Sequence, residues 1–512
     1  MYDTNDEPVL EVSEASLSRS EQAESQPAKL EPVPYVLAFL CSLILSLLSV
    51  VNPLLTHLST NLQSQNLYAG WAMSQGQLPY SQIYGTSGLL YYFILWAGSL
   101  VFGQFLLIAF QTLALWLAGI FLHRTVARLR PKQGLSRSLL LLFYLLVFAL
   151  GFGGLYSTIF VFPFIFWNLS FLVRYLQDDL KDEKFILYGA FGAVAFMIEP
   201  MVSLVFYALT SLVLFVYNIV SKQKARGFYQ FLAALLGFSL IFYPLGYFTV
   251  VNQTFGQAIS QVTYAWDSFN LLGSHLLGNL LYYGLLTVGL GFASAFAVGL
   301  FTKAESTSTR VLRFIGLLGL LATVLGALGL PDQGSYQLLP ALPFAMILLA
   351  LWFNKGKKQA GRHRRDRRQP SLWSSYIAGQ FFLPLLALLY LVGYPLVNEY
   401  LLSSGQSAER ARAAQYIQEK SSTDDKVYAW DNSASLYQAS GRKSAVSLLS
   451  PALYLGTAEN RLGLQSALEN VQPKFILVNN HLELLSDTRQ NLSKNYKETD
   501  LKLSHFKLYE LK

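Results

Sequence analysis

Long apolar runs are the feature that most constrains this chain. They follow one another between Val33 and Val397, and several are about 17 to 25 residues long. A helix of that length crosses a hydrocarbon layer of about 30 Å. Backbone groups in lipid must bond to one another, so such runs are helical. The sequence therefore predicts an α-helical polytopic membrane protein with about eleven transmembrane helices.

The charged residues support this assignment. They make up only 13% of the 512 residues, about half the share in a soluble protein. The net charge is +8, but many Lys and Arg residues lie in short loops between the apolar runs, most densely at 355–368. Basic loops mark the cytoplasmic side of a membrane protein and fit contact with anionic lipid. The predicted partner of this charge is the lipid bilayer, and a nucleic-acid partner is excluded.

The charge pattern also divides the chain into three parts. Residues 1–31 are rich in acidic residues, Ser and Gln and are expected to form a disordered acidic cytoplasmic tail. Residues 32–397 form the transmembrane domain. An odd number of spans then puts residues 398–512 outside, as a small extracytoplasmic α/β domain. Its expected elements are a helix near 405–420, a short helix at 434–438, and strands at 426–430, 474–479 and 506–511.

One apolar segment, 88–102, does not fit as a span. It is short and rich in Tyr and Trp, which favour the membrane interface. If it crossed, every later basic loop would face outward. We therefore expect a helix that lies at the outer face. It follows a long outer loop, 56–87, where Gly76 and Pro79 indicate turns within an ordered structure.

Three stretches carry a family resemblance. In the outer loop the pattern comprises Tyr68, Gly76, Pro79, Tyr80, Gly88, Leu90, Tyr91 and Tyr92. Gly334–Phe344 opens a late span with a Tyr-x-Leu-x-x-Leu-Pro-like stretch, and the third stretch lies in the C-terminal part, around 426–430 and 473–478. With these the chain resembles the GT-C fold membrane glycosyltransferases, in the protein mannosyltransferase and aminoarabinose transferase-like branch of family 39 type.

The resemblance implies an activity. Its members transfer a sugar from a polyprenyl-phosphate carrier to a glycan, lipid or protein acceptor, which implies a cell-envelope acceptor at the outer face of a bacterial plasma membrane. In the family an Asp of the first outer loop is the usual base. Here that place holds Ser64, beside Gln65 and Asn66, and the second acidic place holds Gln82. No Asp or Glu occurs from Asn52 to Gly88.

Carboxylates elsewhere are therefore the candidate bases. An ionisable residue at membrane depth is costly and points to function, which favours Glu199 at the outer end of a span; Asp267 lies in an outer loop among aromatic residues. We name both as catalytic candidates, with an ordinary solvated carboxylate as the alternative. A turn role for Asp332 and a structural role for His57 stay open as well. The substrate-binding candidates are His57, Tyr68, Tyr80, Gln82, Tyr91, Asp332 and Tyr336.

Cofactor motifs do not stand out. The six His residues form no His-x-x-x-His or Glu-x-x-His pair, and no Walker loop is present. We therefore expect no cofactor and name no metal ligand, although a leaving phosphate leaves room for a divalent metal. The single cysteine, Cys41, rules out a disulfide framework.

Three functions remain open from the sequence. The first is an active glycosyltransferase. The second is a catalytically silent GT-C relative that serves as a lipid-sugar-binding or cell-envelope assembly scaffold, which the neutral first loop favours. The third is a transporter or flippase, against which the chain lacks a recognisable repeated half.

Overall fold

The computed structural model describes residues 31–100, 104–129, 131, 133–177, 179–301, 306–354 and 371–512. Val33–Lys512 forms one compact unit. The predicted acidic tail, apart from Glu31, and the basic cluster at 355–368 lie outside the described residues.

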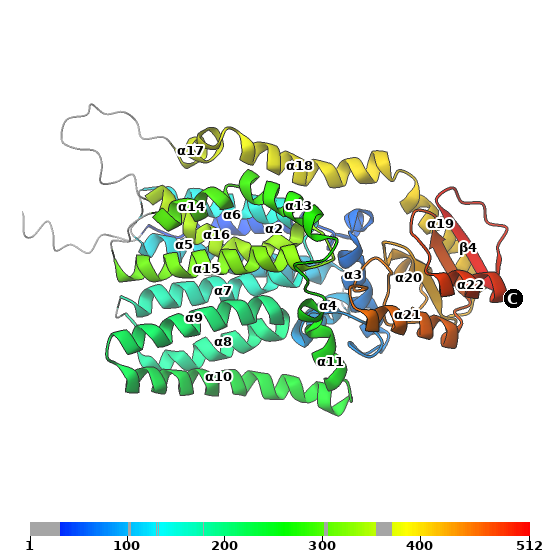
Figure 1. The fold of residues 1–512 in the computed structure, drawn as a ribbon, viewed down its shortest axis with the longest axis horizontal. Coiled ribbons are helices and arrows are strands. Elements are labelled where there is room, and N and C mark those ends of the chain that lie inside the picture. Colours follow the sequence, from blue (N-terminus) through cyan, green and yellow to red (C-terminus); the bar gives the residue numbers. More distant parts are fainter. Residues whose placement is uncertain are drawn as a thin grey trace, which may run out of the picture. The chain divides into compact units, whose positions relative to one another are not determined.

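Helices dominate the described part of this unit up to Leu402 (Figure 1). In the described part of the chain, seven helical segments are long and apolar enough to cross a membrane, or eight if one bent pair counts as a span. The chain is therefore a multi-pass membrane protein, but the predicted number of eleven spans is not confirmed. The helices are α2 (Tyr35–Leu47), α5 (Phe105–Arg128), α6 (Leu135–Leu150), α7 (Ser157–Tyr175), α8 (Phe185–Ile198), α9 (Pro200–Val220), α10 (Lys224–Val251), α13 (Leu276–Gly289), α14 (Phe292–Phe301), α15 (Thr307–Gly329), α16 (Leu342–Asn354), α17 (Leu372–Ile377) and α18 (Leu383–Val397).

Breaks within apolar runs explain much of the difference between the eleven predicted spans and the seven or eight found among the described residues. The run at 276–301 bends by 71° between α13 and α14. Gly291 lies at the bend with φ +74°, a backbone conformation that side chains disfavour. The run at 373–397 is likewise interrupted between α17 and α18, where Phe381 and Phe382 have positive φ. Hydropathy alone reports apolar length, and it does not report where the chain turns.

The outer loop is ordered, as the sequence predicts. A short 3-10 helix, η1 (Pro53–Leu58), leads into α3 (Asn61–Ser74), whose start is fixed by a capping box between Thr60 and Gln63. The expected outer-face helix is α4 (Leu89–Leu100), which packs on α3 and α5. In Figure 1, α3, α4 and α11 (Phe255–Val262) lie at the end of the bundle nearest the C-terminal region.

The C-terminal region contains a four-stranded mixed sheet of order β1-β2-β4-β3. The strands predicted at 426–430, 474–479 and 506–511 are confirmed as β1 (Val427–Trp430), β2 (Phe475–Asn479) and β4 (Phe506–Leu511). β1 and β2 run parallel, and β4 runs antiparallel to β2. The other elements are β3 (Tyr496–Glu498), η6 (Asn398–Leu402), α19 (Gln406–Lys420), α20 (Ser435–Ser440), α21 (Ala458–Val471) and α22 (Ser486–Asn495).

Hydrogen bonds join this region to the outer loop. The backbone N–H of Ala434 donates to Ser64 Oγ at 2.9 Å, and that of Ser444 donates to the Tyr68 hydroxyl at 2.9 Å. Asn61 Nδ2 donates to Ser450 Oγ at 2.9 Å. The loop and the C-terminal region therefore form one packed layer over the ends of the helices.

Candidate functional site

Three cavities lie along this layer. The carboxylate cavity, of about 530 Å³, contains Glu199 and Asp332 and extends between α9 and α15. The polar cavity, of about 790 Å³, lies between the outer loop, the end of α18, and α19 and α20. The third cavity, of about 690 Å³, lies between the segment 267–275 and the segment 451–461.

Glu199 occupies the turn between α8 and α9. A residue before proline favours extended backbone, and proline favours the first position of a helix. Glu199 accordingly has φ −141° and ψ 90°, and Pro200 begins α9. Ser157 Oγ, at the start of α7, donates a hydrogen bond to Glu199 Oε2. Burial raises the pKa of the Glu199 carboxyl to about 7, against the opposing effect of this hydrogen bond.

Asp332 occupies a second turn, between α15 and the 3-10 helix η3 (Ser335–Ala341). The Tyr264 hydroxyl donates to Asp332 Oδ2 at 3.4 Å. Burial raises the pKa of the Asp332 carboxyl to about 6, although hydrogen bonds from the Tyr454 backbone and Tyr264 oppose the shift. Asp332 lines both the carboxylate cavity and the third cavity. Both carboxyls thus combine near-neutral pKa values with access to open space, which suits proton transfer.

The remainder of the carboxylate cavity is mainly apolar. Val202 and Val205 from α9 face the space, as do Leu325 and Gly326 from α15. Among the described residues that line it there is no Lys, Arg or His. A lipid chain fits such walls because burial of apolar surface is favourable. An anionic head group would find hydroxyls and backbone there, and no fixed cation.

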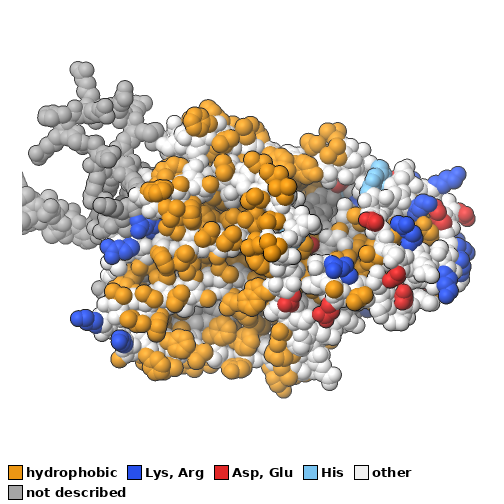
Figure 2. Space-filling view, in the orientation of Figure 1, with side chains coloured by type: hydrophobic (Ala, Val, Ile, Leu, Met, Phe, Trp, Pro, Cys, Tyr) orange, Lys and Arg blue, Asp and Glu red, His pale blue; other side chains and the backbone are white. Residues whose placement is uncertain are grey.

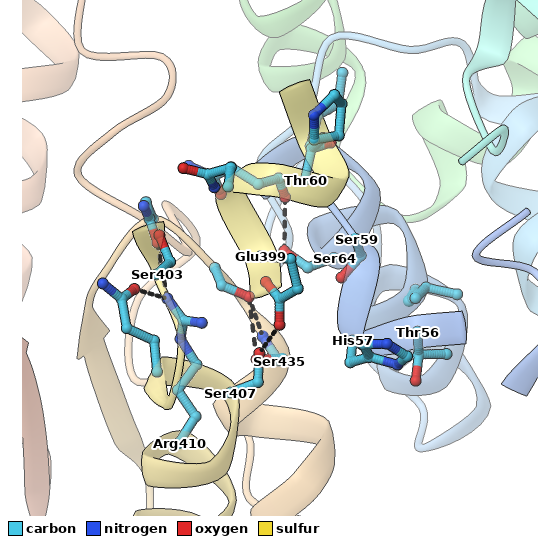
Figure 3. A pocket seen from close by; sticks show the side chains of 18 of the residues that line it. Thr56, His57, Ser59, Thr60, Ser64, Glu399, Ser403, Ser407, Arg410 and Ser435 are labelled. Carbon is cyan, nitrogen blue, oxygen red and sulfur yellow. Dashed lines mark hydrogen bonds between the residues drawn. The ribbon is translucent and has the colours of Figure 1, made fainter. Parts of the chain in front are cut away.

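The polar cavity has a different lining. Figure 3 shows Ser407 and Arg410 on one side and Thr56 and His57 on the other. Ser407 Oγ donates to Glu399 Oε1 at 2.5 Å. His57 Nε2 lies 3.2 Å from the Tyr400 hydroxyl. Hydroxyl and amide groups from both parts of the chain dominate the walls, which suits a ligand with many hydrogen-bonding groups.

A pair of tyrosines separates these two cavities. Tyr156 and Tyr336 stack with ring centroids 4.9 Å apart and an interplanar angle of 10°. Both rings line the carboxylate cavity and the polar cavity, as does Leu62. The Tyr156 hydroxyl lies 3.3 Å from Thr60 Oγ1. We call Leu62, Tyr156 and Tyr336 the shared wall.

The predicted site residues divide between these places. Glu199, Asp332 and Tyr336 come together in the carboxylate cavity. His57 lines the polar cavity. Asp267 is exposed and lines the third cavity, where Thr263 Oγ1 donates to its Oδ2 at 3.3 Å. The structure therefore separates the two catalytic candidates, Glu199 and Asp267.

The remaining predicted residues lie in the packed outer loop or, for Tyr91, in α4, and none lines one of the three cavities. The Tyr80 hydroxyl donates to Ser87 O at 2.9 Å, and the Tyr91 hydroxyl to Leu155 O at 2.8 Å. Tyr68 donates to Gln77 Oε1 at 2.9 Å. Gln82 Oε1 accepts from the Leu78 N–H at 2.9 Å. These contacts hold the loop in shape and join α4 to the turn before α7.

Sequence reasoning missed three residues beside the two carboxyls. Ser157 follows a Gly-rich turn, and a small polar residue at a helix start gives little signal of its own. Tyr264 lies in the aromatic stretch that contains Asp267, so only the choice of residue within it was missed. Tyr454 comes from the C-terminal region with φ +65°, and nothing in the sequence places it near Glu199.

No metal centre is evident among the residues that the structure describes. Within the described ranges, no three His, Cys, Asp or Glu side chains are grouped so that they could hold an ion. The pair Glu199 and Asp332 lines one cavity but supplies only two carboxylates. Most protein sites for a divalent cation use more ligands or share them with substrate phosphates.

Comparison with known proteins identifies the fold. No curated protein matches the chain. The structure is similar to that of ArnT from Cupriavidus metallidurans bound to undecaprenyl phosphate, with a TM-score of 0.56 at 13% identity, over 94% of this chain and 98% of ArnT. The apo state of the same ArnT gives a TM-score of 0.43 at 13% identity, covering 93% and 96%. The archaeal oligosaccharyltransferase AglB from Archaeoglobus fulgidus gives 0.34 at 13% identity, covering 87% and 69%.

The likeness to ArnT confirms the predicted GT-C fold. Two family descriptions match the sequence itself. "Putative competence-induced protein Ccs4 N-terminal domain" covers residues 23–404, and the corresponding C-terminal domain covers residues 407–512. The chain therefore belongs to the competence-induced Ccs4 family.

Proposed function

We propose that this protein is a membrane glycosyltransferase that moves a sugar from a polyprenyl-phosphate carrier to a cell-envelope acceptor, with the carboxylate cavity as its reaction site. The observation that carries the proposal is the composition of that cavity. Two half-buried carboxyls, Glu199 and Asp332, face the same space as an apolar surface of α9 and α15. This pairing suits a substrate with a lipid tail and a reacting sugar.

The reaction balances with the chain's own groups. Glu199 or Asp332 takes the proton of an acceptor hydroxyl as its oxygen bonds to the anomeric carbon of the sugar. The bond between that carbon and the phosphate oxygen breaks, and the polyprenyl phosphate leaves with the electron pair. Glu199 is the preferred base because its pKa of about 7 lies closest to neutral pH. Asp332, in the turn between α15 and η3, then contributes a second carboxyl group to the charge of the site.

The arrangement of charge supports action at the outer face. Figure 2 shows basic side chains at the end of the helical bundle away from the C-terminal region. Basic ends face the cytoplasm in membrane proteins, so the three cavities and residues 398–512 would lie on the extracytoplasmic side. In this proposal the N-terminus is cytoplasmic and the protein resides in the plasma membrane.

A second function has its own support. Ser64, at the place of the family's usual base, donates to Asn61 O at 2.7 Å and accepts the Ala434 N–H. Asn66 Nδ2 donates to Leu155 O at 2.9 Å. The first loop thus uses these positions for packing. A relative that binds a lipid-linked sugar without transferring it, as a scaffold for envelope assembly, would keep such a loop.

A transfer assay tests the first function. Purified protein in nanodiscs is offered polyprenyl-phosphate sugars carrying a labelled sugar, together with an envelope extract as acceptor. Label should move to the acceptor with wild-type protein and with Glu469→Gln, an exposed carboxylate of α21 outside the three cavities. Glu199→Gln should lose the transfer.

Carrier binding separates the two functions. Binding of the labelled carrier without any transfer, equally strong in wild-type and Glu199→Gln protein, would support the scaffold. Transfer that continues undiminished in the double variant of Glu199→Gln and Asp332→Asn would contradict a reaction site in the carboxylate cavity.

A further inference from the structure

The polar cavity takes no part in the chemistry proposed above, yet it is the largest of the three at about 790 Å³. Small-molecule sites fall between about 300 and 1,000 Å³. Its walls come from well-separated stretches of the chain: the outer loop, Gln104, the turn between α6 and α7, the start of η3, the end of α18 with η6, and the region from α19 to Leu453. A space enclosed by such distant segments is a product of the whole fold.

The lining is matched to a polyhydroxylated ligand. Hydroxyls of Ser and Thr alternate there with amides of Asn and Gln, each able to donate and accept. Two of these amides have no other role: in the part of the chain that the structure describes, the side chains of Asn398 and Gln438 make no hydrogen bond within the protein. Both are half-buried at the cavity wall. They are free to bind the hydroxyls of a saccharide.

Charge argues against an anionic ligand. Arg410 is the sole Arg or Lys among the described lining residues, and its guanidinium is already engaged by Asp431, at 2.6 and 3.1 Å. Asp431 is fully buried. Glu399 adds a negative charge to the same wall. A phosphate or sulfate group favours cations that are free to pair with it, and this cavity has no such surplus.

The position of the cavity gives the ligand its role. The shared wall of Leu62, Tyr156 and Tyr336 separates it from the carboxylate cavity, so a ligand in the polar cavity lies next to the proposed reaction site. The rings of Tyr156 and Tyr336 line the polar cavity and offer apolar surface to a sugar ring, while their hydroxyls are polar.

We propose that the polar cavity is a binding site for a neutral saccharide chain, which serves as the acceptor. The acceptor role rests on the proposed function, but the binding does not require turnover. The protein would therefore glycosylate an uncharged glycan, and would discriminate against a phosphorylated or sulfated one.

The test is direct binding. Wild-type protein in nanodiscs is applied to a printed array of neutral and anionic oligosaccharides, and saturation-transfer NMR measures the affinity for the neutral glycans that are retained. Gln438→Ala combined with Asn398→Ala should weaken that affinity at least tenfold. Ala439→Trp, which places a large ring at the exposed cavity wall, should abolish it. Gln418→Ala, an exposed glutamine on α19 outside the cavity, is the matched control and should bind as wild type.

Each outcome is decisive. Retention of anionic glycans alone, retention of no glycan, or affinity that is unchanged in both cavity variants would overturn the proposal. Binding of undecaprenyl phosphate, measured in parallel, should be unchanged in these variants, which shows that they fold. Should the transfer assay fail while neutral glycans still bind in a manner that depends on Gln438, the proposed activity would fall and the saccharide site would stand.

Discussion

The carboxylate cavity and the polar cavity share a wall but differ in chemistry. One has apolar sides from α9 and α15, two carboxyls and no described cation; the other has hydroxyls, amides, an arginine paired with Asp431, and the carboxylate of Glu399. The first environment suits a lipid chain, and the second suits a saccharide. The comparison teaches that a GT-C fold with a neutral first loop still keeps two unlike compartments side by side, with the acidic groups supplied by turns at helix ends.

Among changes that leave the proposed base in place, the largest effect should come from filling the apolar side of the carboxylate cavity. A side chain at Gly326 would point into open space in the carboxylate cavity. Gly326→Trp should therefore weaken binding of undecaprenyl phosphate at least a hundredfold, by an intrinsic fluorescence or radioligand assay. Gly278→Trp, another position with open space but on the exposed side of α13, is the control. Equal loss in both variants would mean that the fold, and not the cavity, had been damaged.

The stability of the structure beside the polar cavity depends on a buried ion pair. Arg410 binds Asp431, and Asp431 also accepts from Asn479 Nδ2 at 2.8 Å. Arg410→Ala leaves a fully buried carboxylate unpaired, so the free energy of unfolding should fall by about 3–5 kcal/mol. Arg412→Ala removes an exposed guanidinium that lies 3.7 Å from Glu409, whose carboxylate keeps its hydrogen bonds from the Ser504 and His505 backbone, and it should cost less than about 1 kcal/mol. Thermal unfolding in detergent compares the two, and similar melting temperatures would refute the importance of the Arg410 pair.

Merging the two cavities gives a smaller effect. Tyr336→Ala removes one ring of the shared wall, whose stacking is worth about 0.5–1.5 kcal/mol. Transfer should fall about tenfold while hydrolysis of the donor by water increases, because an acceptor in the polar cavity is no longer held against this wall beside the reaction site. Tyr336→Phe keeps the ring and should behave nearly as wild type. The ratio of glycosylated acceptor to free sugar measures this effect. An unchanged ratio in Tyr336→Ala would show that the shared wall has no role in favouring transfer over hydrolysis.

Acidity should distinguish the cavities further. A base must be ionised, and the pKa of Glu199 is raised to about 7 and that of Asp332 to about 6. Transfer should therefore decline as the pH falls below about 7, whereas saccharide binding in the polar cavity should change little over the same range. A pH–rate profile that is flat from pH 5 to 8 would contradict the assignment.

The same pKa shifts determine whether the free energy of unfolding rises or falls with pH. Both folded-state pKa values exceed the ordinary values of 4.5 and 3.8, so the folded protein holds protons that the unfolded chain has lost. The free energy of unfolding should fall as the pH rises from about 4 to about 7. Glu199→Gln should reduce that slope, as measured by melting temperature across the range.

The smallest effect is expected at Asp267. It is exposed and lines the third cavity, apart from the two compartments compared here. Asp267→Asn should lower transfer threefold or less, in the assay used for Glu199→Gln. A loss as large as that of Glu199→Gln would restore it as a candidate base and extend the site into the third cavity.

The sequence predicted the fold far better than the site. Apolar runs and alternating strands are local signals, so the bundle and the strands β1, β2 and β4 could be predicted. Turns inside apolar runs, as at Gly291, depend on neighbours such as Gln380 that the local pattern does not reveal. Glu199 and Asp332 could be named because carboxyls at the ends of apolar segments are rare in this chain.

The other part of the site depends on tertiary packing. Tyr68, Tyr80 and Tyr91 carry the family resemblance, yet their hydroxyls bond to other groups of the packed protein, since an aromatic residue gives no local sign of whether it faces a cavity or a core. Tyr454 reaches the carboxylate cavity from more than 250 positions beyond Glu199 along the chain. No periodicity links residues so far apart.

The most direct test of the central claim is the initial rate of sugar transfer from a labelled polyprenyl-phosphate donor by wild-type and Glu199→Gln protein at equal carrier occupancy. The account predicts a rate about 10²–10⁴-fold lower for the variant, the usual contribution of a general base, with unchanged carrier binding. Equal rates in the two proteins, or no transfer by wild-type protein that binds the carrier, would contradict it.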